Sequence, residues 1–195
     1  SDEAIRRLRA ELPEDCWLLL DEAYHDFRDD ADSPFSREVL PGVVRLRTLS
    51  KAHGLAGLRI GYAIAEPETL EMMMKVRIHY AVSTLTLAAA ETVLDHNEEV
   101  RQHVSDVKAR RERLADHFKQ QGADVLPSAT NFIALRLPSA EMGERLNREL
   151  LEAGRLIARP AHPDLGHILR ITAVEDALQP GRFEILEKAL AELKP

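Results

Sequence analysis

A glycine-rich segment around Lys51 contains the residue types that most plainly suggest chemistry. Residues 48–62 read TLSKAHGLAGLRIGY and combine three glycines with two aliphatic hydroxyls, a lysine and an arginine. Glycines let backbone amides approach an anion closely, so the segment is suited to binding a phosphate. Its spacing matches neither the P-loop nor the dinucleotide-binding fingerprint. A glycine-rich connection between strands, with Lys51 and Arg59 solvated, explains the same residues equally well.

A second candidate is Asp21, which ends the apolar run 16–20 and is followed by Glu22, Ala23 and Tyr24. In open α/β sheets, ligands bind outside the carboxyl ends of the strands. The carboxylate of Asp21 would emerge at such an edge. Position alone nevertheless favours a turn or capping aspartate, because Asp is common just after strands.

The first half of the chain predicts short buried strands and then helices. Apolar runs that are too short for helices occupy residues 16–20, 43–46 and 60–65. Continuous apolar runs are typical of strands in a sheet that is covered on both faces. Helical spacing of apolar residues predicts helices at 2–12, 70–76 and 84–94, and a long helix that begins at Asn97.

The second half predicts a lobe in which strands and helices alternate. The long helix from Asn97 has one apolar face, which only Arg111 interrupts. The elements expected after it are a strand at Val125, a strand at 131–137, a helix at 140–153, strands at 156–159 and 168–172, and a helix at 181–193. This order indicates an α+β lobe. We place the boundary near Asn97, which gives domains 1–96 and 97–195.

Composition and charge narrow the class of protein. Of 195 residues, 45% are hydrophobic, and 33 acidic against 26 basic residues give a net charge of -7, which argues against nucleic acid as a partner. No apolar stretch approaches the roughly 20 residues that cross a bilayer, and no basic signal-peptide opening is seen. Cys16 lies in an apolar run, so we expect a buried thiol and a cytoplasmic protein. The eight histidines lack metal-ligand spacing, so no metal is predicted.

Four ordered motifs make the sequence similar to a known family. They are Asp21-Glu22-Ala23-Tyr24, Ser50-Lys51 with Gly54, Gly57, Arg59, Gly61 and Tyr62, Asn131-Phe132, and Leu169-Arg170-Ile171-Thr172. Together they resemble the fold-type I pyridoxal-phosphate (PLP) aminotransferases, nearest the histidinol-phosphate aminotransferase group. The resemblance implies an α/β fold. On this basis the chain comprises part of the PLP-transferase large domain, which has three layers and a mostly parallel sheet. A small α+β C-terminal domain follows it.

The resemblance also implies a role for each matching residue around the cofactor PLP. Lys51 matches the catalytic lysine that forms a Schiff base with the cofactor aldehyde and moves the proton at the substrate. Asp21 matches the carboxylate that keeps the pyridine nitrogen protonated, and Tyr24 matches the phenol that hydrogen-bonds the ring oxygen. The implied contacts to the cofactor phosphate are Thr48, Ser50 and Arg59.

Three residues match substrate-binding positions of the family. Arg170 corresponds to the arginine that grips the substrate α-carboxylate through two parallel hydrogen bonds. Arg159 corresponds to a second arginine, which would contact a substrate phosphate, although residues 160–168 are shorter than the family's loop. Asn131 corresponds to a pocket asparagine. Taken alone, Arg170 reads as a surface arginine and Asn131 equally suits a turn.

The resemblance covers only the second half of such an enzyme, from about residue 12 onward. The first half of these enzymes contributes further cofactor contacts, and each charge-assisted hydrogen bond is worth about 1.5–3 kcal/mol. We therefore expect a fragment that binds PLP weakly and is poorly active. Uncovered sheet edges and apolar faces predict a homodimer or a complementing N-terminal half as partner.

The implied activity is transamination between a small-molecule amino donor and a 2-oxo acid, the donor being an amino acid or an amino-alcohol phosphate. Two alternatives stay open. A threonine-phosphate decarboxylase-like enzyme has Asp, Lys and Arg in the same order and would release carbon dioxide. A non-catalytic dimerisation or regulatory module would fold and associate without giving the absorbance of bound PLP.

Overall fold

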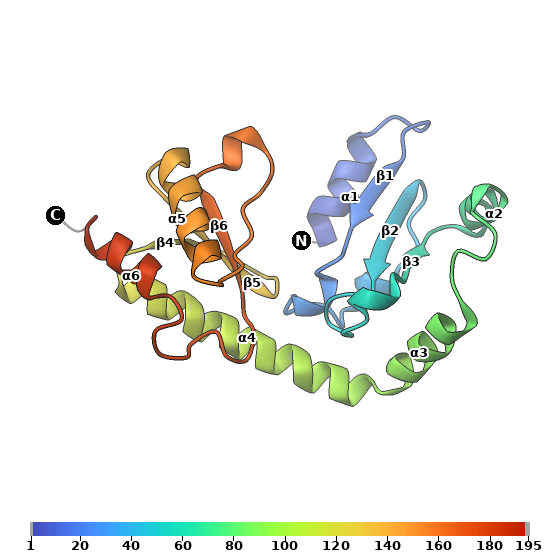
Figure 1. Cartoon of the computed structure of the whole chain (residues 1–195). Helices are drawn as coiled ribbons and strands as arrows, with labels where there is room; N and C mark the ends of the chain where they lie inside the picture. Colours follow the sequence, from blue (N-terminus) through green and yellow to red (C-terminus); the bar gives the residue numbers. More distant parts are fainter. Residues whose placement is uncertain (1, 194–195) are drawn as a thin grey trace. The chain divides into compact units, whose positions relative to one another are not determined.

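A computed structural model describes residues 2–193, and its contacts divide the chain into two compact units, Ser1–His103 and Val104–Pro195 (Figure 1). The division falls within the long helix α4 (Asn97–Gln120), which begins in the first unit and ends in the second. The assignment of 1–96 to a partial PLP-binding domain and of 97–195 to a small C-terminal domain stays a prediction. Among the described residues, no helix combines the length and the apolar character needed to cross a bilayer.

The first unit contains a three-stranded sheet in the order β1-β2-β3. Its elements are α1 (Asp2–Glu11), β1 (Leu18–Asp21), the 3-10 helices η1 (His25–Phe27) and η2 (Pro34–Arg37), β2 (Val43–Thr48), the 3-10 helix η3 (Ala56–Leu58), β3 (Gly61–Ile64), α2 (Pro67–Val76) and α3 (Thr84–Asp95). β1 pairs with β2 in parallel, and β2 pairs with β3 antiparallel. The mostly parallel sheet expected from the sequence is therefore a mixed sheet in this unit.

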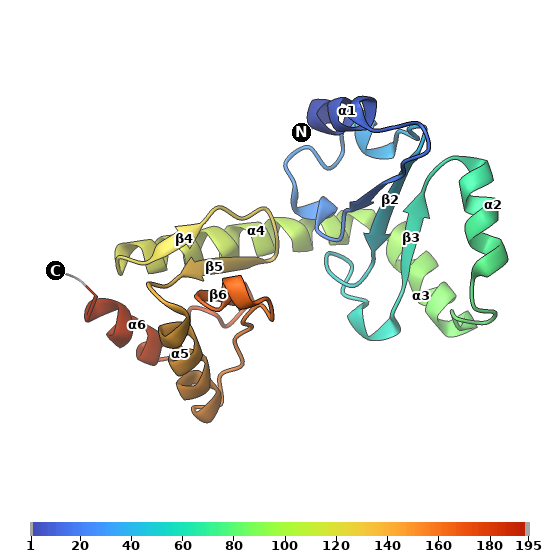
Figure 2. The same cartoon turned by 90° about the horizontal axis from the view of Figure 1, so that it is seen from above.

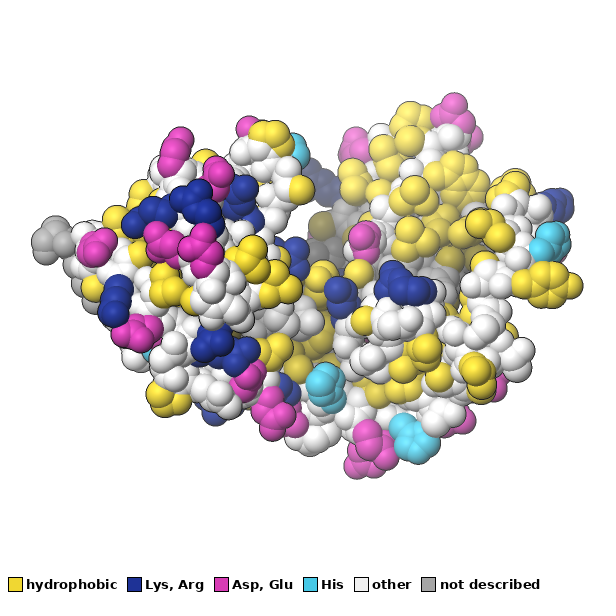
Figure 3. Space-filling model, in the orientation of Figure 1, with side chains coloured by type: hydrophobic (Ala, Val, Ile, Leu, Met, Phe, Trp, Pro, Cys, Tyr) yellow, Lys and Arg dark blue, Asp and Glu magenta, His cyan; other side chains and the backbone are white. Residues whose placement is uncertain are grey.

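One face of this sheet is partly exposed, which corrects the expectation of strands buried on both faces. Leu19 is 65% exposed and Leu46 is 38% exposed. Leu46 is the Cα partner of Asp21, two residues after Leu19, so the three side chains share one face. On the side in view, hydrophobic side chains gather over this unit in Figure 3. The apolar runs were read correctly as strands, but the described chain leaves Leu19 and Leu46 uncovered, although Val44, the partner of Leu19 on the same face, is only 4% exposed.

Cys16 lies outside the sheet, contrary to the expectation of a buried thiol. Its backbone N–H donates to the carbonyl of Pro13 at 3.1 Å, which makes a turn before β1, and the residue is exposed. The strand begins only at Leu18. The apolar run in the sequence therefore begins two residues before the strand does.

The second unit contains a separate three-stranded antiparallel sheet in the order β4-β5-β6. After α4 its elements are β4 (Asp124–Leu126), β5 (Phe132–Arg136), α5 (Ala140–Glu152), the 3-10 helix η4 (Pro163–Leu165), β6 (Ile168–Thr172) and α6 (Glu184–Ala191). Leu114 and Phe118 of α4, Leu146 of α5 and Leu186 of α6 form one core cluster with alternate residues of β5 and β6. The three helices therefore contribute to a core on one face of this sheet, and Figure 2 shows the same elements turned by 90°.

The strand expected at 156–159 is reduced to one isolated bridge between Ala158 and Arg170. Ala158 donates its N–H to the Arg170 carbonyl at 3.2 Å, and Arg170 donates back at 2.8 Å. In an antiparallel pair, the backbone N–H of every second residue faces the partner strand. The next such residue after Ala158 is Pro160, which has no N–H to donate to β6. The backbone thus explains why the pairing stops after one pair.

Gly143 marks a close approach between α5 and the loop before β6. A Cβ atom at this position would lie 2.2 Å from the carbonyl oxygen of Gly166. We expect Gly143→Ala to lower the free energy of unfolding by about 1–3 kcal/mol, because the two backbones must separate. Urea denaturation followed by circular dichroism measures the change. Gly57→Ala is the control, because a Cβ there meets nothing within 4 Å. Equal stabilities of both variants would show that α5 moves freely away from the loop.

Candidate active site

The carboxyl ends of β1 and β2 bring candidate cofactor residues to one edge of the first sheet. Asp21 ends β1, and its Cα partner Leu46 lies two residues before Thr48, so Asp21 and Thr48 share the exposed face. Tyr24 follows in the turn after β1. The Lys51 ammonium nitrogen Nζ lies 5.5 Å from the centre of the Tyr24 ring. An acid, a phenol and an amine are thus supplied by the segments that leave these two strands.

Local hydrogen bonds define both of these turns. The carboxylate oxygen Oδ1 of Asp21 accepts a hydrogen bond from the Ala23 N–H at 3.0 Å, which fixes the first turn. The Thr48 hydroxyl lies 2.9 Å from the Ser50 hydroxyl and accepts the Ser50 N–H at 3.1 Å. The second turn therefore places two hydroxyls side by side directly before Lys51.

Arg59 is positioned differently from the other candidates. Its backbone is left-handed, with φ of 53°, and its guanidinium donates to the carbonyl of Ala56 at 2.7 Å. The side chain is exposed and is bonded within its own turn. Its assignment as a phosphate ligand stays a prediction.

A buried ion cluster lies on the opposite face of the same strands, and the sequence reading gave its members no role. The Glu22 carboxylate accepts hydrogen bonds from Arg45 at 2.7 Å and from Arg47 at 2.9 Å. The side chains of Glu22 and Arg45 are 7% and 2% exposed. Glu22 follows Asp21 directly, so this cluster anchors the turn that carries Asp21 and Tyr24. The one hint of this cluster in the sequence is that Arg45 and Arg47 stand at alternate positions of the same strand.

Three further candidates lie in the second unit. Arg170 is half-buried in β6, and its guanidinium carbon lies 3.9 Å from the centre of the Phe132 ring. Arg159 is exposed and follows Ala158, the bridge partner of Arg170. Asn131 is half-buried, and its backbone carbonyl accepts a hydrogen bond from the Ala173 N–H at 2.9 Å. The structure thus places the substrate candidates around the β5 and β6 strands of one sheet.

Comparison with known proteins then identifies the family. Residues 2–178 match the class I and II aminotransferases. The chain belongs to this family. The aromatic amino acid aminotransferase of Nocardia farcinica is 42% identical over 148 residues, which cover 72% of this chain and 41% of that protein. The crystal structure of histidinol-phosphate aminotransferase from Sinorhizobium meliloti in complex with pyridoxal-5'-phosphate has a TM-score of 0.85 at 32% identity. The similar region covers 98% of this chain and 52% of the chain in that crystal structure.

These similarities confirm the aminotransferase family expected from the four motifs and show that the chain has part of the PLP-transferase fold. A crystal structure of L-threonine-O-3-phosphate decarboxylase from Porphyromonas gingivalis is also similar, with a TM-score of 0.71 at 26% identity, over 97% of this chain and 58% of that one. The aminotransferase chain spans about half the length of the relatives that it matches. The three-layer arrangement and the small C-terminal domain stay predictions.

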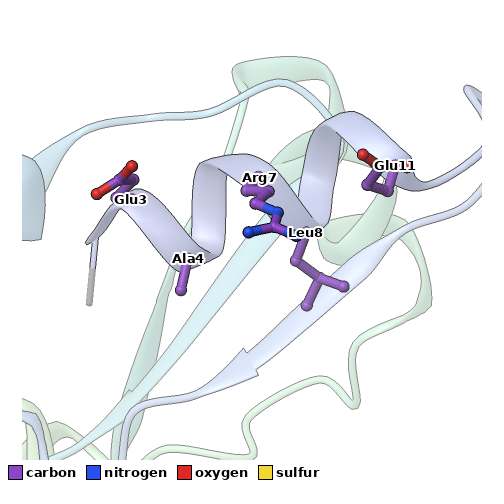
Figure 4. A pocket seen from close by; sticks show the side chains of 5 residues that line it. All are labelled: Glu3, Ala4, Arg7, Leu8 and Glu11. Carbon is purple, nitrogen blue, oxygen red and sulfur yellow. The ribbon is translucent and has the colours of Figure 1, made fainter.

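One surface hollow of this aminotransferase chain lies away from the candidate residues. It has a volume of about 490 Å³, and its lining comes from one helix, α1, through Glu3, Ala4, Arg7, Leu8 and Glu11 (Figure 4). None of these side chains is a nucleophile or belongs to a matched motif. Within residues 2–193, no group of three His, Cys, Asp or Glu side chains is arranged to hold a metal ion.

We expect His25 to make the stability of the first unit sensitive to acid. Burial is the largest cause that lowers the pKa of His25 from its usual 6.5, and the positive charge of Arg47 is the second. The ring nitrogen Nε2 lies 3.0 Å from the Ala31 carbonyl. A lowered pKa means that the fold favours the neutral ring, so the contribution of His25 to stability is full above pH 6.5 and is lost as the pH drops toward the folded-state pKa.

We expect His25→Gln to lose less stability than the wild type when the pH is lowered through this window, because its amide does not titrate and can still donate to Ala31. Urea denaturation followed by Trp17 fluorescence reports on this unit. His103→Gln, at an exposed position, is the control. If His25→Gln and the wild type lost stability in parallel, His25 would not cause the acid sensitivity.

Proposed function

We propose that this chain is the part of a PLP-dependent aminotransferase that supplies the cofactor lysine and the substrate arginine. The observation that carries the proposal is the placement of Lys51 5.5 Å from the Tyr24 ring, beside the strand that ends at Asp21. Family membership and similarity to an aminotransferase that contains PLP support the same assignment. The activity, substrates and partners below are those proposed for the whole protein.

The residues at the strand edge suit PLP chemically. When bound, PLP supplies an electron sink that stabilises negative charge on the substrate Cα. Lys51 would hold the cofactor through its Nζ and then carry the proton that leaves Cα. Asp21 would keep a proton on the pyridine nitrogen, and Tyr24 would hydrogen-bond the ring oxygen. The hydroxyls of Thr48 and Ser50 and the guanidinium of Arg59 would contact the phosphate.

The second unit would bind the amino donor. Arg170 offers a planar fork that fits a carboxylate with two parallel hydrogen bonds, and the exposed Arg159 would add a second positive charge. Asn131 would contribute an amide to the pocket. This set suits an anionic amino acid, an aromatic amino acid or an amino-alcohol phosphate, and the relatives include aromatic and histidinol-phosphate aminotransferases.

Two assays distinguish the candidate reactions. We expect the longer protein with PLP to convert a 2-oxo acid into its amino acid when histidinol phosphate or an aromatic amino acid is the donor. A decarboxylase would instead release carbon dioxide from threonine phosphate, a reading favoured by the similar decarboxylase structure. Carbon dioxide without any transfer of the amino group would replace the proposal by this alternative. A folded protein without either activity and without PLP absorbance would support the non-catalytic module.

We further propose a homodimer or a complementing N-terminal half as partner. The exposed face with Leu19 and Leu46, and the share of about half of each relative's length, support this proposal. Apolar surface of this kind is normally covered. Sedimentation analysis of the chain, alone and with a separately expressed N-terminal half, measures the association. A cytoplasmic location also stays a prediction.

A further inference from the structure

Arg170 lies on the face of the second sheet that is opposite to the core. Its neighbours along β6, Leu169 and Ile171, are 0% and 3% exposed and belong to the core cluster. Successive side chains of a strand point to opposite faces, so Arg170 points away from the core. Its cross-strand partner on β5 is Ala134, which lies on the same face as Phe132. This face therefore presents a cation next to an aromatic ring.

Small neighbours let the Arg170 side chain lie across the sheet. Ala134 is its partner on one side and Ala158 on the other, so no large side chain stands in its way. The guanidinium thereby reaches Phe132, the diagonal neighbour, with its carbon 3.9 Å from the ring centre. A cation over an aromatic ring face is attracted by the ring's negative quadrupole. This contact restricts the position and the plane of the guanidinium.

The Arg170 guanidinium also keeps a buried donor available. Its Nε atom is buried and has no hydrogen-bond partner among the described residues. Buried N–H groups are normally paired, so an unpaired one next to an ordered guanidinium indicates a site for an external acceptor. A carboxylate matches the arginine fork because its two oxygens can accept two parallel N–H groups.

Phe132 is itself held in place by the turn that precedes β5. The Phe132 N–H donates to the Thr130 hydroxyl at 3.2 Å, and the Phe132 carbonyl accepts from the Ser128 hydroxyl at 2.6 Å. Arg111 of α4, only 8% exposed, donates to the Thr130 carbonyl at 3.0 Å. The charged residue that interrupts the apolar face of α4 thus fixes the turn that carries the aromatic ring.

We propose that Phe132 is a positioning residue for Arg170 and that Arg111 acts through Phe132 by fixing the turn. The second unit thereby holds a carboxylate-binding arginine in its binding geometry before the cofactor is bound. This proposal rests on the proposed function, because that function assigns the substrate carboxylate to Arg170. It adds two residues, Phe132 and Arg111, to those that determine how the carboxylate is recognised.

The test follows the Nε–H resonance of Arg170 by nuclear magnetic resonance in the full chain without PLP. The resonance is assigned by its loss in Arg170→Lys, and acetate at constant ionic strength is the probe. We expect acetate to shift the wild-type resonance in a saturable way. Phe132→Leu should raise the acetate dissociation constant by about threefold to tenfold, because the ring no longer orders the guanidinium. Phe132→Tyr should retain wild-type binding.

Two arginine variants on α4 give an independent test. We expect Arg111→Met to move the Arg170 resonance and weaken acetate binding in the same direction as Phe132→Leu. Arg113→Met, on the exposed side of the helix, is the matched control and should leave both unchanged. If either Phe132→Leu or Arg111→Met fails to fold, as shown by its amide spectrum, the other variant decides.

The outcomes separate this proposal from the proposed function. Acetate binding equal to that of the wild type in a folded Phe132→Leu protein would overturn the positioning role. A wild-type Arg170 resonance that ignores acetate would overturn the preformed site. Loss of acetate affinity in both variants, with no PLP absorbance at Lys51, would uphold the carboxylate site while contradicting the proposed cofactor chemistry.

Discussion

Replacing Lys51 by alanine is expected to abolish the visible absorption band that lysine-bound PLP gives when PLP is added to the chain. The band requires a covalent bond to an amine, so its loss should be complete. Lys51 is the described lysine that lies at the strand edge, 5.5 Å from the Tyr24 ring, whereas the other described lysines lie on helices. Titration of PLP into wild type and variant, followed by absorbance, measures the effect.

Lys75→Ala is the matched control, because Lys75 is an exposed lysine in the last turn of α2 in the same unit. We expect it to keep the wild-type band. Circular dichroism of both variants verifies that the fold is retained. A Lys51→Ala protein with an unchanged band would remove Lys51 from the cofactor site.

Replacing Glu22 by alanine is expected to lower the free energy of unfolding of the first unit by about 3–5 kcal/mol. Glu22 accepts hydrogen bonds from both Arg45 and Arg47 in a buried cluster. Without the carboxylate, the Arg45 guanidinium, whose side chain is 2% exposed, would stay buried without its countercharge. Urea denaturation followed by the fluorescence of Trp17 reports on this unit.

The control for Glu22→Ala is Asp30→Ala, which removes an exposed ion pair with Arg28 in the same region. Exposed pairs contribute about 0–1 kcal/mol, so little change is expected. Because Glu22 also anchors the turn after Asp21, its loss should weaken PLP binding as well. Equal stabilities of the two variants would mean that solvent or another residue neutralises the arginines.

The regular elements of the second half were predicted well from the sequence. Residues 168–172 were expected as a strand and form β6, and the helix expected from Asn97 begins there. Strong periodicity and clear caps determine such elements locally. The 156–159 strand was wrong because apolar composition does not reveal which backbone groups have a partner, and Pro160 removes a donor.

The site could be predicted only where a motif carried it. Lys51, Asp21 and Tyr24 were proposed as cofactor residues from their matching motifs, and the structure places their segments at one strand edge; their roles stay predictions. The connection from Arg111 through Thr130 to Phe132 could not be predicted from the sequence. It depends on the turn before β5, which lies next to helix α4 in the folded structure. Contacts of that kind arise from tertiary packing rather than from local spacing.

The most direct test of the central claim is to locate the bond between PLP and the protein. The chain, or the longer protein that contains it, is incubated with PLP, reduced with borohydride, digested and analysed by mass spectrometry. We predict that the added mass lies on the peptide that contains Lys51 and that no other lysine is modified stoichiometrically. A modification spread over the surface lysines, with Lys51 unmodified, would contradict the assignment of this strand edge as a cofactor site.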